Sequence, residues 1–135
     1  MTALAPVART APDYTSRSYW TGTIKMSLSK FFILRVLHDR PMHGYDIARA
    51  VERTTNGCCS PTEGTIYPVL REFEEGGYVT VLAETVSGRA RKTYTLTARG
   101  REAFKVGVEA WMAVPQALTE TERVVERSAA EGCCP

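Results

Sequence analysis

Four cysteines stand in two adjacent pairs, Cys58-Cys59 near the middle of the chain and Cys133-Cys134 near its end. Thiolate sulfur is a soft ligand that selects thiophilic ions such as arsenite, antimonite, mercury and cadmium. Neither pair has the Cys-x-x-Cys spacing that structural zinc sites favour. The two pairs together predict a site for a soft metal ion or metalloid, with all four thiolates as candidate ligands.

Other chemistries suit the same residues. Free cysteine often packs as a small apolar side chain, and this applies more readily to Cys58 and Cys59 than to the pair near the chain's end. A thiol from each pair also suits a redox switch that closes a disulfide under oxidation. A disulfide within one pair is disfavoured because the ring between adjacent cysteines is strained.

The composition fits one small globular domain. The chain has 135 residues, 44% of them hydrophobic, so a core of ordinary size needs no cross-links. No stretch reaches the roughly 18 to 20 uncharged apolar residues of a membrane span, and the first residues lack the apolar run of a secretory leader. We expect a cytoplasmic protein without membrane contact, whose thiols stay reduced.

Hydrophobic periodicity predicts two helices in the first part of the chain. The first begins at Ser27, carries apolar residues at helical spacing and is ended by Pro41. The second follows Gly44, places Tyr45 on its apolar face and stops at Asn56-Gly57. The chain up to residue 22 is rich in Pro, Thr, Ser and Arg, so we expect a flexible extension there.

A third helix is predicted directly after the first cysteine pair. Ser60 or Thr62 is a suitable N-cap, Pro61 fits the first turn, and Gly76-Gly77 ends the helix. One side of this helix carries an apolar stripe that would face a core. The stripe consists of Ile66, Leu70 and Phe73.

A β-hairpin and further helices complete the chain. Residues 78–85 and 92–97 are rich in β-forming residues and flank a turn at Gly88. Helical periodicity resumes at residue 98, and Pro115 interrupts it. The last helix is acidic and has few apolar residues, so it favours pairing with a second subunit over burial within one chain.

The order of three helices and a hairpin is that of a winged helix-turn-helix, a mainly α fold with a small β-hairpin. In this fold the third helix enters the major groove of DNA. We therefore divide the chain into an extension (1–22), a DNA-binding domain (23–97), C-terminal dimerisation helices (98–127) and a cysteine-bearing tail (128–135).

Polar and basic side chains lie where DNA contacts require them. Thr62, Thr65 and Tyr67 fall on the first turns of the third helix, although Tyr67 also suits packing against the second helix. The net charge is only +2, yet residues 84–105 hold six basic and two acidic side chains. Among them, Arg89, Arg91 and Lys92 stand at the tip of the hairpin, the wing, where they suit phosphate contacts.

Three stretches together resemble the PadR-like family of transcriptional regulators. They are HGY at residues 43–45, GTIYP at 64–68 and GRxRKxYxLTxxG at 88–100, within a resemblance that covers roughly residues 27–110. The resemblance implies a dimeric winged-helix repressor whose C-terminal helices form the dimer interface, often with help from the N-terminal helix. It also implies DNA contacts from Tyr67 and the first turn of the third helix, and wing contacts from Arg89, Arg91 and Lys92.

The position of the first cysteine pair suggests how induction would work. A ligand held by Cys58, Cys59 and the tail thiols would pull on the start of the third helix and release the operator, an inverted repeat of double-stranded DNA. No cofactor is expected besides this inducer. There are three alternatives: a redox-sensing regulator, a thiol enzyme or metal-transfer protein, and a winged-helix module for protein contacts. The enzyme alternative is disfavoured because neither cysteine pair has a neighbouring base.

Overall fold

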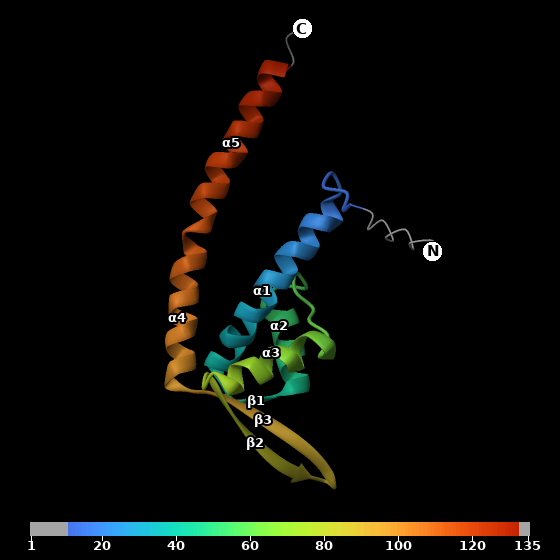
Figure 1. Ribbon diagram of the computed structural model, residues 1–135, viewed down its shortest axis with the longest axis vertical. Helices are drawn as coiled ribbons and strands as arrows, with labels where there is room; N and C mark the ends of the chain where they lie inside the picture. Colours follow the sequence, from blue (N-terminus) through green and yellow to red (C-terminus); the bar gives the residue numbers. More distant parts are fainter. Residues whose placement is uncertain (1–10, 133–135) are drawn as a thin grey trace, which may run out of the picture.

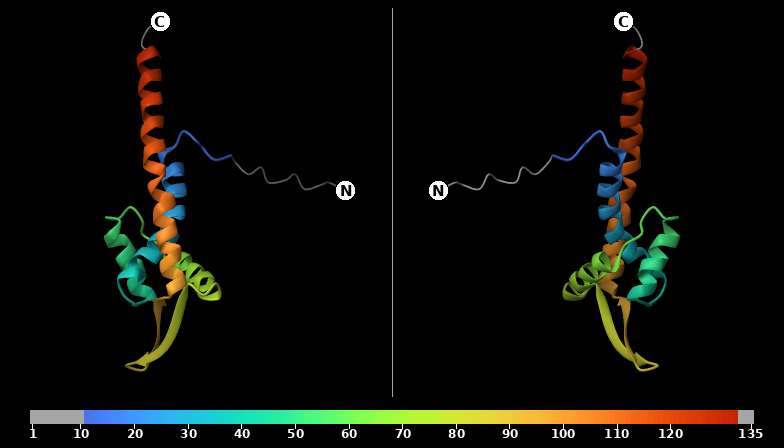
Figure 2. Two further views of the ribbon diagram at one scale, coloured as in Figure 1. Left: turned by 90° about the vertical axis from the view of Figure 1, so that its left-hand side faces the viewer. Right: turned by 90° about the vertical axis from the view of Figure 1, so that its right-hand side faces the viewer.

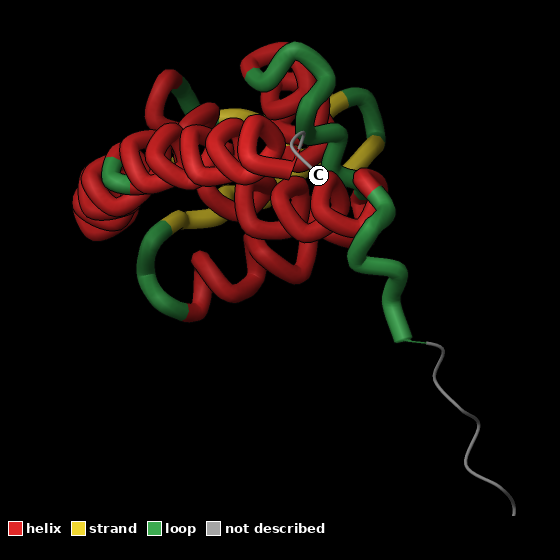
Figure 3. The backbone as a smooth tube through the Cα atoms, turned by 90° about the horizontal axis from the view of Figure 1, so that it is seen from above, coloured by secondary structure: helices red, strands yellow, loops and turns green. Residues whose placement is uncertain are grey.

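The computed structural model describes residues 11–132 as a mainly helical protein with a small antiparallel sheet (Figure 1). Viewed from above, the helices lie over the sheet, of which only short parts are visible (Figure 3). The elements are α1 (Arg17–Asp39), β1 (Met42–His43), α2 (Gly44–Thr54), α3 (Glu63–Glu75), β2 (Val79–Val86), β3 (Arg89–Leu96), α4 (Ala98–Met112) and α5 (Val114–Gly132). The predicted winged helix-turn-helix is confirmed.

Helices α1, α2 and α3 enclose one apolar core. Each contributes residues at helical spacing whose side chains are at most 1% exposed: Ile33, Leu37, Ile47, Val51, Ile66 and Leu70. Burying one such side chain stabilises the fold by roughly 1.5–3 kcal/mol. The apolar stripe predicted for the third helix is confirmed, because Phe73 is buried beside Ile66 and Leu70.

Helix α1 begins at Arg17, well before the predicted start at Ser27, so the expected flexible extension is partly helical. An aromatic cluster orders this first part. The indole Nε1 of Trp20 donates to the carbonyl of Tyr14 at 2.8 Å, and Tyr19 packs edge-on against both rings. The hydroxyl of Ser27 bonds back to the preceding turn at the carbonyl of Thr23, which is typical of serine inside a helix and not at its cap.

The sheet has three strands in the order β1-β3-β2. The hairpin of β2 and β3 was predicted, and its turn residues Ser87 and Gly88 have φ angles of 53° and 77°. Positive φ at both central residues matches the type I′ turn that suits the twist of a hairpin. Strand β1 was not predicted, because a segment of two residues is too short to show an alternating pattern.

The C-terminal part is a long helical arm with one interruption. Helix α4 packs on α1 through Phe104 and Trp111, whose rings lie 5.6 and 6.2 Å from that of Phe31. The interruption falls at Ala113, and Pro115 lies in the first turn of α5, where the missing N–H is tolerated. Helix α5 runs to Gly132, so the whole described part of the predicted tail, residues 128–132, is helical.

Helix α5 leads away from the rest of the molecule in every view (Figures 1 and 2). None of its residues is buried, and Leu118, Val124 and Val125 are all more than half exposed. An apolar face of this kind lacks a partner within the described chain. Among residues 11–132, no helix is long and apolar enough to cross a membrane.

Substitution of Gly100 would test how closely α4 packs on the sheet. A Cβ at this position would lie 2.2 Å from the carbonyl oxygen of Tyr78 and 2.5 Å from Leu96 Cδ1. We expect Gly100→Ala to lower the free energy of unfolding by about 3 kcal/mol, because the backbone carbonyl cannot move aside freely. Urea unfolding at one fixed protein concentration measures the change.

The matched control is Gly22→Ala in α1, where a new Cβ meets nothing within 4 Å. It should raise stability by about 0.5–1 kcal/mol through the helix propensity of alanine. Equal effects of the two substitutions would contradict the described contact between α4 and β3.

Candidate nucleic-acid interface

Helix α3 buries one side and exposes the other. Of the two predicted N-caps, Ser60 and Thr62, the structure has Thr62, but its side chain makes no capping bond. Its Oγ1 instead lies 3.4 Å from that of Thr65. Both threonines are exposed. Pro61 precedes the cap, so its predicted place in the first turn is wrong. The hydroxyls of Thr62 and Thr65 thus face solvent at the start of α3, free to accept or donate hydrogen bonds.

Pro68 lies inside α3. A proline cannot donate to the carbonyl four residues earlier, here that of Gly64, and a proline inside a helix costs about 3 kcal/mol. The helix continues past this point because Leu70 and Phe73 are held in the core. The turn before Pro68 is therefore bound less tightly to the rest of the helix than an uninterrupted turn would be.

Tyr67 both packs and remains accessible. Its ring lies against Gly44 at the start of α2, where a Cβ would come within 2.8 Å of the ring and 2.9 Å of the hydroxyl. Only glycine leaves room for this contact. The side chain is still 41% exposed. The two interpretations of Tyr67 are thus compatible: the ring fixes α3 against α2, and its outer edge stays available.

The wing presents three exposed cations. Arg89, Arg91 and Lys92 all lie on β3, and the ion pairs among the described residues involve other side chains. Glu84 stands opposite Arg91 in the register of the hairpin. Arg89 and Arg91 share one face of the strand, whereas Lys92 points to the other. These charges are therefore available to a partner.

The start of α3 and the wing lie at the same end of the molecule, opposite the far end of α5 (Figures 1 and 2). At this end the hairpin holds the three wing cations against one carboxylate, Glu84. A helix of exposed hydroxyls beside a basic hairpin matches the geometry with which winged helices read the major groove and hold the flanking backbone.

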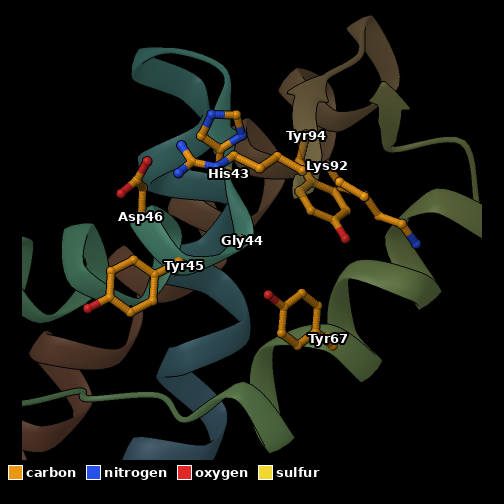
Figure 4. A pocket seen from close by; sticks show the side chains of 9 residues that line it. His43, Gly44, Tyr45, Asp46, Tyr67, Lys92 and Tyr94 are labelled. Atoms are coloured by element: carbon orange, nitrogen blue, oxygen red, sulfur yellow. The ribbon is translucent and has the colours of Figure 1, made fainter. Parts of the chain in front are cut away.

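A cavity of about 590 Å³ lies between the start of α2, helix α3 and strand β3 (Figure 4). The sequence did not predict this cavity or the place of two of its tyrosines in it. Tyr45, predicted on the apolar face of the second helix, is 61% exposed, whereas Tyr94 is only 5% exposed. The exposure of Tyr45 could have been predicted from its spacing. Tyr45 stands two positions before the buried Ile47, which is about 200° around a helix and therefore on nearly the opposite face.

His43 connects α2 to the wing. Its Nδ1 lies 3.2 Å from the hydroxyl of Thr93 on β3, next to the ladder that joins β1 and β3. That contact fixes one side of the cavity.

The two central thiols differ sharply in environment. Cys58 is exposed, whereas Cys59 is fully buried in the core. The backbone of Cys59 is fixed by Thr55, whose Oγ1 accepts from its N–H at 3.0 Å. Burial, and to a lesser degree the neighbouring Cys58, raises the pKa of the Cys59 thiol. Cys59 thus packs as an apolar residue in this conformation, the alternative that the sequence left open.

No cluster of three potential metal ligands occurs among residues 11–132. Cys58 and Cys59 contribute two sulfurs, one of them inaccessible. The predicted ligands Cys133 and Cys134 lie outside the described residues. Within the described residues, the two sulfurs therefore supply only part of the shell that a soft ion takes.

The sequence matches a known family and known proteins. Residues 33–106 match the profile of the Transcriptional regulator PadR-like family. A segment of 73 residues is 32% identical to the transcriptional regulator YqjI of Escherichia coli K12. The match includes 54% of this chain and 34% of YqjI, so the chain spans about a third of that relative's length.

Solved structures share the fold. A transcriptional regulator of Clostridium thermocellum superposes with a TM-score of 0.64 at 21% identity, covering 73% of this chain and 96% of that one. TA0346 of Thermoplasma acidophilum superposes with a TM-score of 0.61 at 26% identity, covering 73% and 91% of the two chains.

The burial of Cys59 predicts unequal thiol reactivity. The thiolate is the reactive form, and a buried thiol with a raised pKa supplies less of it. We expect iodoacetamide at pH 8 to alkylate Cys58 at least about tenfold faster than Cys59 in the reduced native protein. Tandem mass spectrometry of the peptide that contains both residues measures the two rates.

The same labelling in urea is the control, and there the two rates should converge because the core is lost. Equal rates in the native protein would show that Cys59 is not part of the core.

Proposed function

Because this chain belongs to the PadR-like family of transcriptional regulators, we propose that it is a repressor that binds double-stranded operator DNA as a homodimer. The observation that carries this proposal is the shared face of α3 and the wing. Thr62, Thr65 and Tyr67 would meet base edges in the major groove, and the wing cations would hold phosphates. Membership of a family of regulators excludes the enzyme alternative.

The unpartnered arm supports a homodimer. Helix α5 buries no residue of its own, whereas helices in proteins take most of their stability from packing an apolar face. Pairing with the same helices of a second subunit would cover Leu118, Val124 and Val125. A two-fold dimer presents two α3 helices, so the operator would be an inverted repeat with half-sites about one helical turn, or a multiple, apart.

The thiols support a soft metal or metalloid as inducer. Cys58 is exposed in the loop before α3, and Cys59 is buried directly behind it. A thiophilic ion that takes both sulfurs must draw Cys59 out of the core, and this movement displaces the start of α3. Such a ligand binds the displaced form more tightly than the DNA-competent form, which is the condition for release of DNA.

Cys133 and Cys134 would complete the ligand shell. Within one chain, α5 leads Gly132 away from the loop that carries Cys58 (Figure 1). Two further residues extend at most about 7 Å. This arrangement favours tail thiols supplied by the second subunit of the dimer.

The DNA interface predicts a specific effect of wing charges. Arg89→Ala and Arg91→Ala should each weaken binding to the operator and to unrelated DNA by a similar factor, because phosphates carry no sequence information. The slope of log K against log salt should fall by about one for each phosphate that a variant no longer neutralises. Fluorescence anisotropy over a salt series measures both quantities.

Arg17→Ala is the matched control, since Arg17 is exposed at the far end of α1. It should leave the affinity and the salt slope unchanged. Wing variants with the salt slope of the unmodified protein would contradict the assigned role of the wing.

The inducer proposal predicts release of DNA by arsenite. Gel-shift titrations of the reduced dimer with arsenite, antimonite, mercury, cadmium and zinc would rank the ligands, and we expect the thiophilic ions to release DNA where zinc does not. Cys58→Ser should retain DNA binding and lose the response. Cys58 is the better single variant because its exposed side chain makes no contribution to the core.

A variant with all four cysteines changed to serine separates the alternatives. If arsenite still released DNA from it, the thiol site would be wrong. Release by peroxide without metal, reversed by dithiothreitol, would favour the redox switch instead.

A further inference from the structure

The cavity beside the wing holds a hydrogen-bond donor without a partner. Tyr94 is only 5% exposed, yet its hydroxyl makes no hydrogen bond among the described residues. Every fully buried polar side-chain atom in that part of the chain has a partner. The exposed remainder of Tyr94 therefore includes its hydroxyl, which extends into the cavity toward α3 (Figure 4).

This hydroxyl is a donor at neutral pH. Burial, then the neighbouring Tyr67 and Glu74, raise the pKa of the Tyr94 phenol, so the group keeps its proton. A protonated phenol aimed into a cavity suits an acceptor oxygen on a ligand.

The charges at the cavity favour an anion. Arg91 and Lys92 border it from β3, against a single carboxylate, Asp46, at the start of α2. Anionic oxygens accept the strongest hydrogen bonds from cationic donors, and phosphate takes several at once. The negative charge of Asp46 opposes the binding of an anion, so removing this charge is one way to test the preference.

The walls favour a flat ring as well. Tyr45 and Tyr67 line the cavity with rings that are 61% and 41% exposed, although large apolar surfaces are usually buried. Stacking on tyrosine stabilises a bound nucleobase and tolerates any base, because every base has a π-face. A volume of about 590 Å³ is in the range of small-ligand pockets.

We propose that this cavity binds a nucleotide, with the Tyr94 hydroxyl and Lys92, which share one face of β3, on its phosphate and the tyrosine rings against its base. This inference rests on the proposed function, because the site lies on the face assigned to DNA. The phosphate therefore comes from one of two sources, a free nucleotide or the DNA backbone. A free nucleotide in the cavity would occupy space between α3 and the wing and so compete with the operator.

Calorimetric titration of the full-length reduced dimer with adenosine 5′-monophosphate and with inorganic phosphate tests the site directly. We expect saturable binding of the nucleotide, tighter than that of phosphate. Tyr94→Phe keeps the ring and removes the donor, so affinity should fall about tenfold. Lys92→Met should weaken binding similarly from an exposed position, and Asp46→Asn should strengthen it severalfold.

Tyr14→Phe is the matched control, because Tyr14 is exposed in the N-terminal aromatic cluster, away from the cavity. It should leave nucleotide affinity unchanged. Unfolding midpoints of Tyr94→Phe and Lys92→Met show whether either variant has lost its fold. Lys92→Met, whose side chain is exposed, keeps the test decisive if Tyr94→Phe unfolds.

Anisotropy with operator DNA distinguishes the two sources. Loss of nucleotide binding in Tyr94→Phe with unchanged DNA affinity identifies a free nucleotide as the ligand. Weaker DNA binding by the same variant, with competition between nucleotide and operator, identifies a backbone phosphate. Absence of saturable nucleotide or phosphate binding, together with unchanged DNA affinity in Tyr94→Phe, would overturn the proposal. A chain that bound nucleotide but no operator would instead refute the proposed function.

Discussion

The apolar stripe of α3 is the contact on which the rest of the structure depends. Ile66, Leu70 and Phe73 can be buried only if α3 lies across α1 and α2, and this orientation sends Thr65 and Tyr67 outward. The close approach of Tyr67 to Gly44 then fixes the rotation of the helix. Burial on one side thus determines which side chains a partner meets on the other.

Much of this arrangement was predictable from the sequence, because it follows from repeated spacing. The stripe of α3, the glycine-marked ends of α2 and α3, and the turn at Gly88 each depend on local chemistry that a single segment carries. The wing cations were found for the same reason. Their exposure on a hairpin follows from the hairpin itself.

Features that depend on contacts between distant segments were not predictable. The first turns of α1 form around Tyr14, Tyr19 and Trp20, which show no helical periodicity. The cavity combines residues from α2, α3 and β3 that no single segment displays. Sequence left two roles open for Cys59, and only the packing of the loop between α2 and α3 puts it in the core.

Pro68 gives α3 two parts with different mechanical properties. The part after it is anchored by Leu70 and Phe73, whereas the part before it lacks the bond that would tie Gly64 to position 68. Thr62 and Thr65 thus lie on a turn that can move more easily than the anchored part of the helix. Under the proposed function, adjustment of this turn would let one protein accommodate half-sites of slightly different shape without disturbing its core.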